Sequence, residues 1–136
     1  MSLTYKVEPQ KGWLLAAFEG FYDSSMAEEF TDQVLEVCKK HKPTKLLIDM
    51  RGVEGEMSKW SRYGLTVTAA KKYFLGILLG KVRKCRFAIV GNIPLVDPDK
   101  FEEVVATDRG FDLKIFTNIK HAYVWLDVEV ELVGKS

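Results

Sequence analysis

Residues 45–50 read Lys-Leu-Leu-Ile-Asp-Met, and this short apolar run decides the fold of the chain. Pro43 precedes the run and ends the amphipathic stretch before it, while residues 51–56 follow as a polar segment with two glycines. Three consecutive aliphatic residues suit a strand that is covered on both faces, as in a parallel sheet. The sequence therefore predicts a buried strand over residues 45–50 and a polar loop over residues 51–56.

Similar apolar runs on either side of this strand alternate with amphipathic stretches. Further strands are predicted at residues 6–9, 13–19, 86–91 and 112–116. Helices are predicted at residues 25–42, 58–79, 97–110 and 119–126. Asp23, Ser24 or Ser25 can cap the first of them, and Ser25 with Glu28 has the spacing of a capping box. The resulting order, β-β-α-β-α-β-α-β-α, predicts an α/β fold with a mostly parallel five-stranded sheet. The first strand is expected antiparallel at the sheet edge, because its connection is too short for a crossover.

Composition limits the class of protein. The chain has 136 residues, of which 47% are hydrophobic and 29% charged, so we expect a single globular domain over residues 1–136. The net charge of +1 argues against a dedicated nucleic-acid binder. The start of the chain shows no signal-peptide core, no apolar run could span a membrane, and Cys38 and Cys85 match no zinc or redox motif. These features predict a cytoplasmic protein with reduced, buried thiols.

Polar residues gather where the parallel strands are expected to end. Such sheets bind ligands beyond the carboxyl ends of their strands. The predicted rim holds Asp49, Arg51, Glu54, Asn92 and Ser58, with Glu19, Glu56 and Ser61 close to them. A partner-docking or small-ligand site is one interpretation, and ordinary loop polarity with a serine helix cap is the other.

Catalytic and metal-binding patterns are weak. Asp49 and Glu54 lack any sign of the shifted pKa values that general acid–base catalysis needs. His41 and His121 fall on different helices, with no further ligand at metal-binding spacing. We therefore expect no catalytic residues, metal or cofactor, and we expect that the protein is not an enzyme.

The helix over residues 58–79 has an unusually broad apolar face. Its two predicted stripes are Leu65–Ala69–Tyr73–Ile77 and Val67–Ala70–Phe74–Leu78. One stripe can face the sheet, so the other predicts a homodimer through Trp60, Tyr73, Phe74 and Leu78. The segment over residues 71–86 also carries six basic residues and no acid. Contact with a membrane surface or an acidic partner is conceivable there, but a core helix followed by a solvated basic turn is the favoured interpretation.

Three segments resemble the STAS domains of anti-sigma-factor antagonists and sulfate transporters. They are Leu46-Leu47-Ile48-Asp49-Met50-Arg51-Gly52-Val53, Arg86-Phe87-Ala88-Ile89-Val90-Gly91, and Lys114-Ile115-Phe116 with Ala122 and Trp125-Leu126. The third segment is similar to the ending of the SpoIIAA-like subgroup. The resemblance implies a SpoIIAA-like fold and a regulatory binding module. Its distant fold similarity to CRAL-TRIO domains implies a lipid-binding alternative.

The resemblance also singles out a serine. In anti-sigma-factor antagonists a kinase partner phosphorylates a serine at the start of the second helix, which falls here on Ser58, with Ser61 as the second choice. The family's Asp-Ser-Ser-Gly is replaced by Met57-Ser58-Lys59-Trp60. Because the aspartate, the second serine and the glycine are missing, we expect no phosphorylation.

These observations lead to one main hypothesis and two rivals. The main hypothesis is a non-enzymatic STAS-like regulatory module that binds a protein partner, itself or both. The first rival is a carrier of a small apolar ligand or lipid, in which the helix over residues 58–79 lines a pocket. The distant rival is a small enzyme that uses the Asp49 and Arg51 rim.

Overall fold

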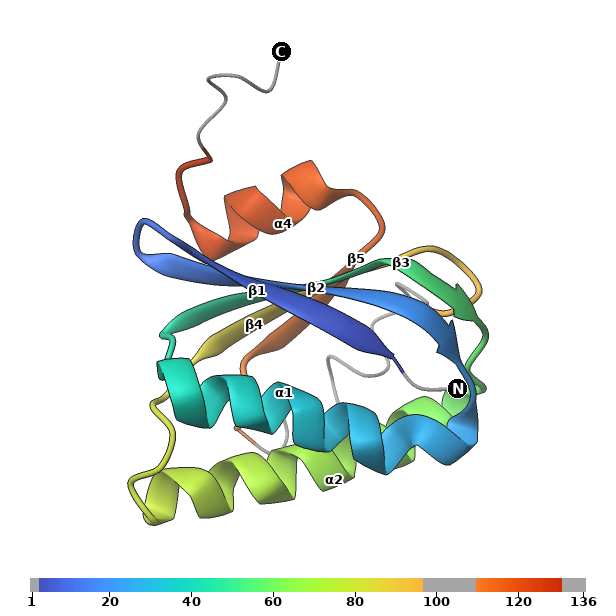
Figure 1. Ribbon diagram of the computed structural model, residues 1–136, viewed down its shortest axis with the longest axis horizontal. Coiled ribbons are helices and arrows are strands. Elements are labelled where there is room, and N and C mark those ends of the chain that lie inside the picture. The colour runs from blue at the N-terminus through green and yellow to red at the C-terminus, as the bar shows by residue number, and fades with distance from the viewer. Residues whose placement is uncertain (1–2, 97–109, 131–136) are drawn as a thin grey trace.

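The computed structural model describes residues 3–96 and 110–130, which form a five-stranded sheet with helices on both faces (Figure 1). The strands are β1 (Thr4–Gln10), β2 (Trp13–Tyr22), β3 (Lys45–Gly55), β4 (Arg86–Val90) and β5 (Leu113–Phe116). The helices are the 3-10 turn η1 (Ser24–Met26), α1 (Ala27–His41), α2 (Lys59–Leu78) and α4 (Ile119–Leu126). The helix predicted over residues 97–110 lies, except for its last residue, outside the described residues.

The sheet has the strand order β1-β2-β3-β4-β5, with β1 antiparallel to β2 and the other neighbours parallel. Gln10 pairs with Trp13 across a tight hairpin in which Gly12 has a φ of 83°. Helix α1 joins β2 to β3 and α2 joins β3 to β4, and each of these crossovers places the next strand beside the last. The predicted fold class and edge strand are therefore confirmed.

The polar loop predicted at residues 51–56 is wrong for most of its length. Strand β3 continues through it to Gly55 and pairs with β2 as far as Tyr22, after a register shift between Ala17 and Glu19. Backbone pairing with a neighbouring strand does not require apolar side chains, so the polar residues of this extension simply face outward. The paired ends of β2 and β3 therefore project beyond the last residues at which β3 pairs with β4.

Of the three caps predicted for the first helical segment, Asp23 is the one observed. Its carboxylate accepts a hydrogen bond of 2.9 Å from the Ser25 backbone N–H. The Ser25–Glu28 capping box is therefore wrong, and a 3-10 turn occupies its place before α1. At α2 the predicted serine cap is confirmed, since the Ser58 hydroxyl accepts from the Ser61 N–H at 3.1 Å.

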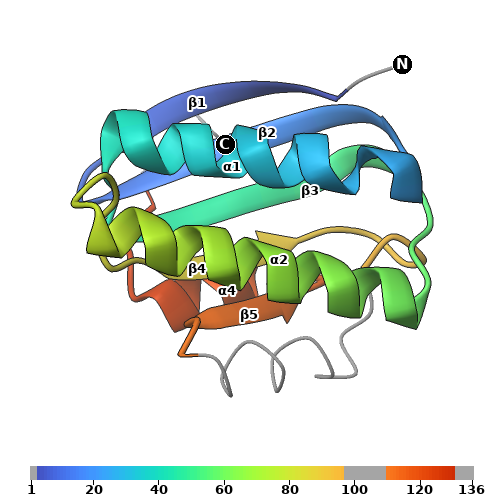
Figure 2. The same ribbon diagram turned by 90° about the horizontal axis from the view of Figure 1, so that it is seen from below.

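Helices α1 and α2 lie side by side on one face of the sheet, and α4 lies on the other (Figures 1 and 2). Strand β3 shows how the alternation of side chains serves both layers. Leu46 and Ile48 belong to the larger core under α1 and α2, whereas Leu47 belongs to the smaller core under α4. Asp49 continues the row of Leu47 on the α4 side.

The buried stripe of α2 differs from both predicted stripes. It runs through Arg62, Thr66, Ala70, Tyr73 and Gly76, at helical spacing. Tyr73 is only 2% exposed and packs its ring against Phe87 and Phe111. The prediction mixed members of two helix faces because aromatic and small residues occur on both. Tyr73 belongs to the core and is therefore wrong as a surface residue of an interface.

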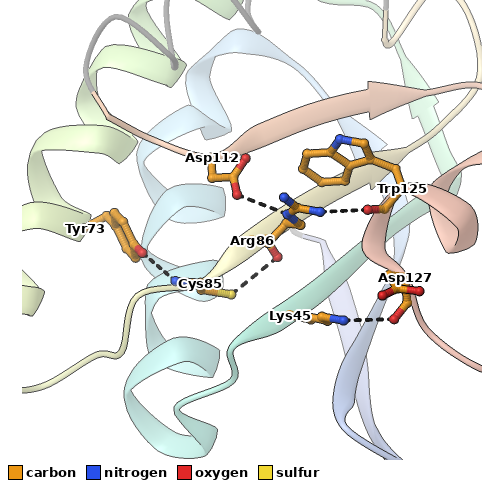
Figure 3. A network of polar contacts seen from close by, with 7 residues as sticks. All are labelled: Lys45, Tyr73, Cys85, Arg86, Asp112, Trp125 and Asp127. Carbon is orange, nitrogen blue, oxygen red and sulfur yellow. Dashed lines mark hydrogen bonds and ion pairs between the residues drawn. The ribbon is translucent and has the colours of Figure 1, made fainter.

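Polar contacts close the end of the sheet where β3, β4 and β5 begin (Figure 3). Arg86 donates to the Asp112 carboxylate at 3.1 Å and to the Trp125 carbonyl at 2.9 Å, and its guanidinium lies 4.6 Å from the centre of the Trp125 ring. Lys45 donates to the Asp127 carbonyl at 2.8 Å. These contacts fix the end of α4 against the starts of β3, β4 and β5.

Both cysteines are free and buried, as predicted. Burial raises the pKa of the Cys38 thiol to about 12 and raises the pKa of the Cys85 thiol as well. Thiols with raised pKa values stay protonated and unreactive at neutral pH.

Candidate functional site

The predicted rim residues form two separate groups. The first group is Asp49, Arg51 and Asn92. Arg51 makes a two-pronged ion pair with Asp49, with Nη2–Oδ2 and Nε–Oδ1 distances of 2.8 and 2.9 Å. The Asp49 carboxylate also accepts from the Arg51 backbone N–H at 3.0 Å, and the Asn92 side chain donates to the Arg51 carbonyl at 3.2 Å.

This ion pair faces α4, where its charges act on Tyr123. Burial is the main cause that raises the pKa of Tyr123, with Asp49 adding to the rise and Arg51 opposing it. The hydrogen bonds that Arg51 donates to the Asp49 carboxylate raise the pKa of Arg51, so the guanidinium stays charged. Both oxygens of the carboxylate are already engaged with Arg51, which makes the group a structural clasp rather than a vacant acid or base.

The second group surrounds the start of α2, at the ends of the β2 and β3 extensions. A hollow of about 680 Å³ opens there to the surface. Its lining is Phe21, Tyr22, Asp23, Ser24, Gly55, Glu56, Met57, Ser58 and Ser61. Glu54 is exposed on β3 next to Gly55 and is paired with Phe21 of β2. The structure thus places Ser58 and Ser61 together, and in a different surface feature from the Asp49 clasp.

A second hollow of about 330 Å³ adjoins the first, since Glu56, Met57 and Ser58 line both. Three large apolar side chains in these hollows or in the first turn of α2 are exposed. Trp60 is 75% exposed, Ile93 68% and Phe21 45%. Phe21 lines the first hollow and Ile93 the second, while Trp60 follows Ser58 in the first turn of α2. We call the two hollows and these three side chains the α2-start surface.

Sequence reasoning named Ser58, Ser61 and Trp60 but missed Phe21 and Ile93. Phe21 was left out because the second strand was predicted to end at residue 19. Ile93 stands beside Pro94 in a loop where no periodicity marks it. Only the fold brings these residues to one place.

The serines at this surface are already engaged with each other. The Ser58 hydroxyl donates to the Ser61 hydroxyl at 3.0 Å, in addition to its role as helix cap. The start of a helix favours anionic groups, because its first N–H groups point outward. Ser58 therefore has a structural role that needs no modification.

Tyr22 lines the first hollow, and its hydroxyl is buried in the protein. The side chain is 1% exposed, and among the described residues the hydroxyl has no hydrogen-bond partner. Burial, and secondarily the charge of Asp23, raises the pKa of Tyr22. The phenol thus stays neutral at physiological pH.

The remaining predicted interface residues differ in exposure. Leu78 is 83% exposed at the end of α2, together with Leu75 at 55% and Leu79 at 59%. Phe74 is partly buried against the larger core. Trp60 lies at the opposite end of the same helix. The surface of α2 therefore has two apolar ends rather than one continuous stripe.

Small apolar cavities lie between α1, α2 and the sheet. Two of them, with volumes of about 70 and 60 Å³, share Phe30, Leu65, Thr66, Ile89 and Leu113 in their linings. Pockets for small-molecule ligands span roughly 300–1,000 Å³. These two cavities give the lipid-carrier alternative no support.

Residues 3–96 and 110–130 lack two features that would point to other functions. No group of three or more potential metal ligands occurs there. None of the helices in that part of the chain combines the length and the apolar character needed to cross a bilayer.

Similarity to known proteins is found in the structure and not in the sequence. No protein-family model matches the sequence, and no curated protein is similar enough to count as a match. Among solved structures, an anti-sigma factor antagonist from Mycobacterium paratuberculosis superposes with a TM-score of 0.58 at 18% identity, over 93% of this chain and 96% of that chain.

Two other solved structures give lower scores. An uncharacterized DUF3478-family protein from Shewanella loihica has a TM-score of 0.47 at 22% identity, over 92% of this chain and 94% of its own. The anti-sigma factor antagonist SpoIIAA in its unphosphorylated form has a TM-score of 0.46 at 10% identity, over 93% of this chain and 100% of its own. Together with the topology, the Mycobacterium structure shows that the chain has the SpoIIAA-like fold, which is the fold of the STAS domains that its sequence resembles.

Proposed function

We propose that the chain, as a single domain, is a non-enzymatic regulatory module that binds a protein partner through the α2-start surface. The observation that carries the proposal is the exposure of Phe21 and Ile93 in the linings of two joined hollows, with exposed Trp60 in the first turn of the helix that begins there. Aromatic side chains are enriched at protein interfaces, and truncating a single tryptophan there often removes much of the affinity.

The likeness to an anti-sigma factor antagonist supports this proposal without identifying the partner. A cytoplasmic anti-sigma-type protein is the class of partner that the fold suggests. The polar rim of the surface would add hydrogen bonds around an apolar centre, which is the usual anatomy of an interface.

Self-association is a second form of the same proposal. Trp60 and Leu78 remain exposed at the two ends of α2, so a second copy could cover either end. Sedimentation of the purified chain at rising concentration would detect it. A dimer that Trp60→Ala dissolves would make the partner a second copy.

A photo-crosslinking amino acid at position 60 tests the proposal in the native host. The matched control carries the same group at Val124, which is 79% exposed on α4, on the other face of the sheet. We expect a partner that crosslinks from position 60 and not from position 124. The purified pair should then lose at least about tenfold in affinity with Trp60→Ala. Equal crosslinking from both positions, or unchanged affinity of Trp60→Ala, would contradict the proposal.

A further inference from the structure

The end of the molecule opposite the α2-start surface combines exposed leucines with basic residues. Both α1 and α2 end there, at the same end of the sheet as the hairpin that joins β1 to β2 (Figures 1 and 2). Leu75 and Leu78 in the last turn of α2, and Leu79 at its C-cap, are each more than half exposed.

Exposed basic residues occur at the same end of the molecule as these leucines. Lys71 is exposed one turn before Leu75 on the same face of α2. The turn after the helix adds exposed Lys81, Arg83 and Lys84, and the last turn of α1 and its cap add exposed Lys39, Lys40 and Lys42. We call these residues and the three leucines the basic leucine end.

The turn after α2 holds its basic residues in place. Gly80 adopts a φ of 70°, and the Lys81 N–H donates to the Gly76 carbonyl at 2.8 Å. Val82 is 6% exposed and packs over Gly76. Because Val82 points inward, its neighbours Lys81 and Arg83 are directed toward solvent.

Exposed charge is distributed unevenly over residues 3–96 and 110–130, although the net charge of the full chain is only +1. Exposed acids also occur at the basic end: Glu8 near the β1–β2 hairpin, Glu36 one turn before Lys40 in α1, and Asp112, Asp127 and Glu129 next to β5 and α4. These five acids are fewer than the seven basic residues of the basic leucine end. Exposed acids also gather at the α2-start end: Glu19, Asp23, Glu28, Glu54 and Glu56. An anionic surface would therefore attract one end of the molecule and repel the other.

We propose that the basic leucine end binds the surface of an anionic lipid bilayer. Leu75, Leu78 and Leu79 would enter the boundary between headgroups and acyl chains, while the lysines of this end and Arg83 contact the lipid phosphates. Aliphatic insertion combined with basic charge is the pattern of peripheral membrane binding. A nucleic acid would use the charges but leave the leucines exposed to water.

This orientation has a consequence for the protein partner. With the basic leucine end on the bilayer, the α2-start surface faces away from it, since the two lie at opposite ends of α2. Bilayer and partner would bind at the same time. The two proposals can therefore fail independently.

Flotation with lipid vesicles tests the bilayer proposal. The full chain is mixed with phosphatidylcholine vesicles that either contain or lack phosphatidylglycerol. We expect flotation with the anionic vesicles only, weakened by salt because exposed charges are screened. Binding that ignores the anionic lipid, or no binding at all, would overturn the proposal.

Two paired variants separate charge from insertion. Lys81→Glu with Lys84→Glu should weaken binding at least about 25-fold, since each basic residue at an anionic surface contributes roughly fivefold. Leu78→Ser with Leu79→Ser should weaken it at least about tenfold. The matched controls on α4, Lys120→Glu and Val124→Ser, should bind like the wild type.

Circular dichroism confirms that each variant is folded before the assay. If the leucine pair changes nothing while the lysine pair abolishes binding, the contact is electrostatic only and the insertion is overturned. Competition in which a DNA oligonucleotide binds more tightly than the vesicles, or a dimer that the leucine pair dissolves, would assign this end to another partner and overturn the proposal.

Discussion

The Tyr73 hydroxyl accepts a hydrogen bond of 2.7 Å from the Cys85 backbone N–H, and this contact joins the middle of α2 to the residue before β4 (Figure 3). Both residues are buried, at 2% and 3% exposure. Strand β4 pairs with β3 from Arg86 onward, so the position of Cys85 fixes where β4 begins beside β3. A buried N–H that has no partner cannot bond to water instead, so it destabilises the folded state by about the free energy of one hydrogen bond.

Tyr73→Phe should therefore lower the free energy of unfolding by about 1–3 kcal/mol, because it leaves the Cys85 N–H unsatisfied while keeping the ring. Urea unfolding followed by circular dichroism measures the change. Tyr5→Phe is the matched control, since Tyr5 stacks on Phe18 through its ring. A loss as small for Tyr73→Phe as for Tyr5→Phe would show that the hydrogen bond contributes nothing.

Stability should fall above pH 9 because of the buried thiols. Burial raises the pKa of Cys38 from 9.0 to about 12. Above the ordinary thiol pKa the unfolded chain releases this proton and the folded chain keeps it, so rising pH favours unfolding until the folded value is reached. Between about pH 8 and 10 the wild type should lose about 1 kcal/mol more than Cys38→Ala.

Urea titrations at the two pH values, with each protein compared to itself, measure this difference. Any loss of unfolding free energy that Cys38→Ala causes equally at both pH values then cancels. Parallel pH dependences in the wild type and the variant would mean that the Cys38 thiol ionises as easily in the folded state as in the unfolded one.

How much of this molecule the sequence predicts follows from the range of the forces involved. Strand β3 was recognised from Leu46, Leu47 and Ile48, because local periodicity reports burial directly. Its extension to Gly55 was missed, because pairing with β2 is a long-range contact that leaves no apolar pattern. The candidate site is likewise predicted only where the signal is local. Ser58 is recognisable from the sequence as a helix cap, whereas Ile93 lines the same hollow as Ser58 only because of the fold.

The helix cap at α2 gives the next prediction. The Ser58 hydroxyl accepts from the Ser61 N–H, so Ser58→Ala should lower the free energy of unfolding by about 1 kcal/mol. Ser58→Asp should keep most of the stability, because a carboxylate also caps and suits the helix dipole. Thermal unfolding ranks the three proteins. Equal losses for alanine and aspartate would refute the capping role.

Phosphorylation of Ser58 is not expected. The residues that accompany the phosphorylated serine in the resembling family are replaced here by Met57, Lys59 and Trp60. The hydroxyl is also engaged by Ser61. Intact mass spectrometry of the chain purified from its own host should give the unmodified mass. A stoichiometric addition of phosphate that Ser58→Ala removes would contradict this, and Ser61→Ala is the control for the neighbouring hydroxyl.

The last prediction uses two glycines of contrasting surroundings. Gly55 ends β3 with a φ of 125°, and a Cβ there would lie 2.3 Å from the Tyr22 carbonyl oxygen. Gly64 lies in α2, and a Cβ there would meet nothing within 4 Å. Gly55→Ala should therefore lower the free energy of unfolding by about 2–3 kcal/mol, through backbone strain and a clash with backbone. Gly64→Ala should raise it by about 0.5–1 kcal/mol, because alanine is the better helix former.

Both variants can be compared in one series of urea titrations, with Gly64→Ala as the control that an added methyl group is not harmful in itself. Gly55 also lines the larger hollow, so the strain should reach the α2-start surface. Once a partner is identified by crosslinking from position 60, Gly55→Ala should weaken its binding and Gly64→Ala should not. If Gly55→Ala is as stable as the wild type, the β2 and β3 extensions separate easily. The hollow would then lack the rigid wall that the proposed interface needs.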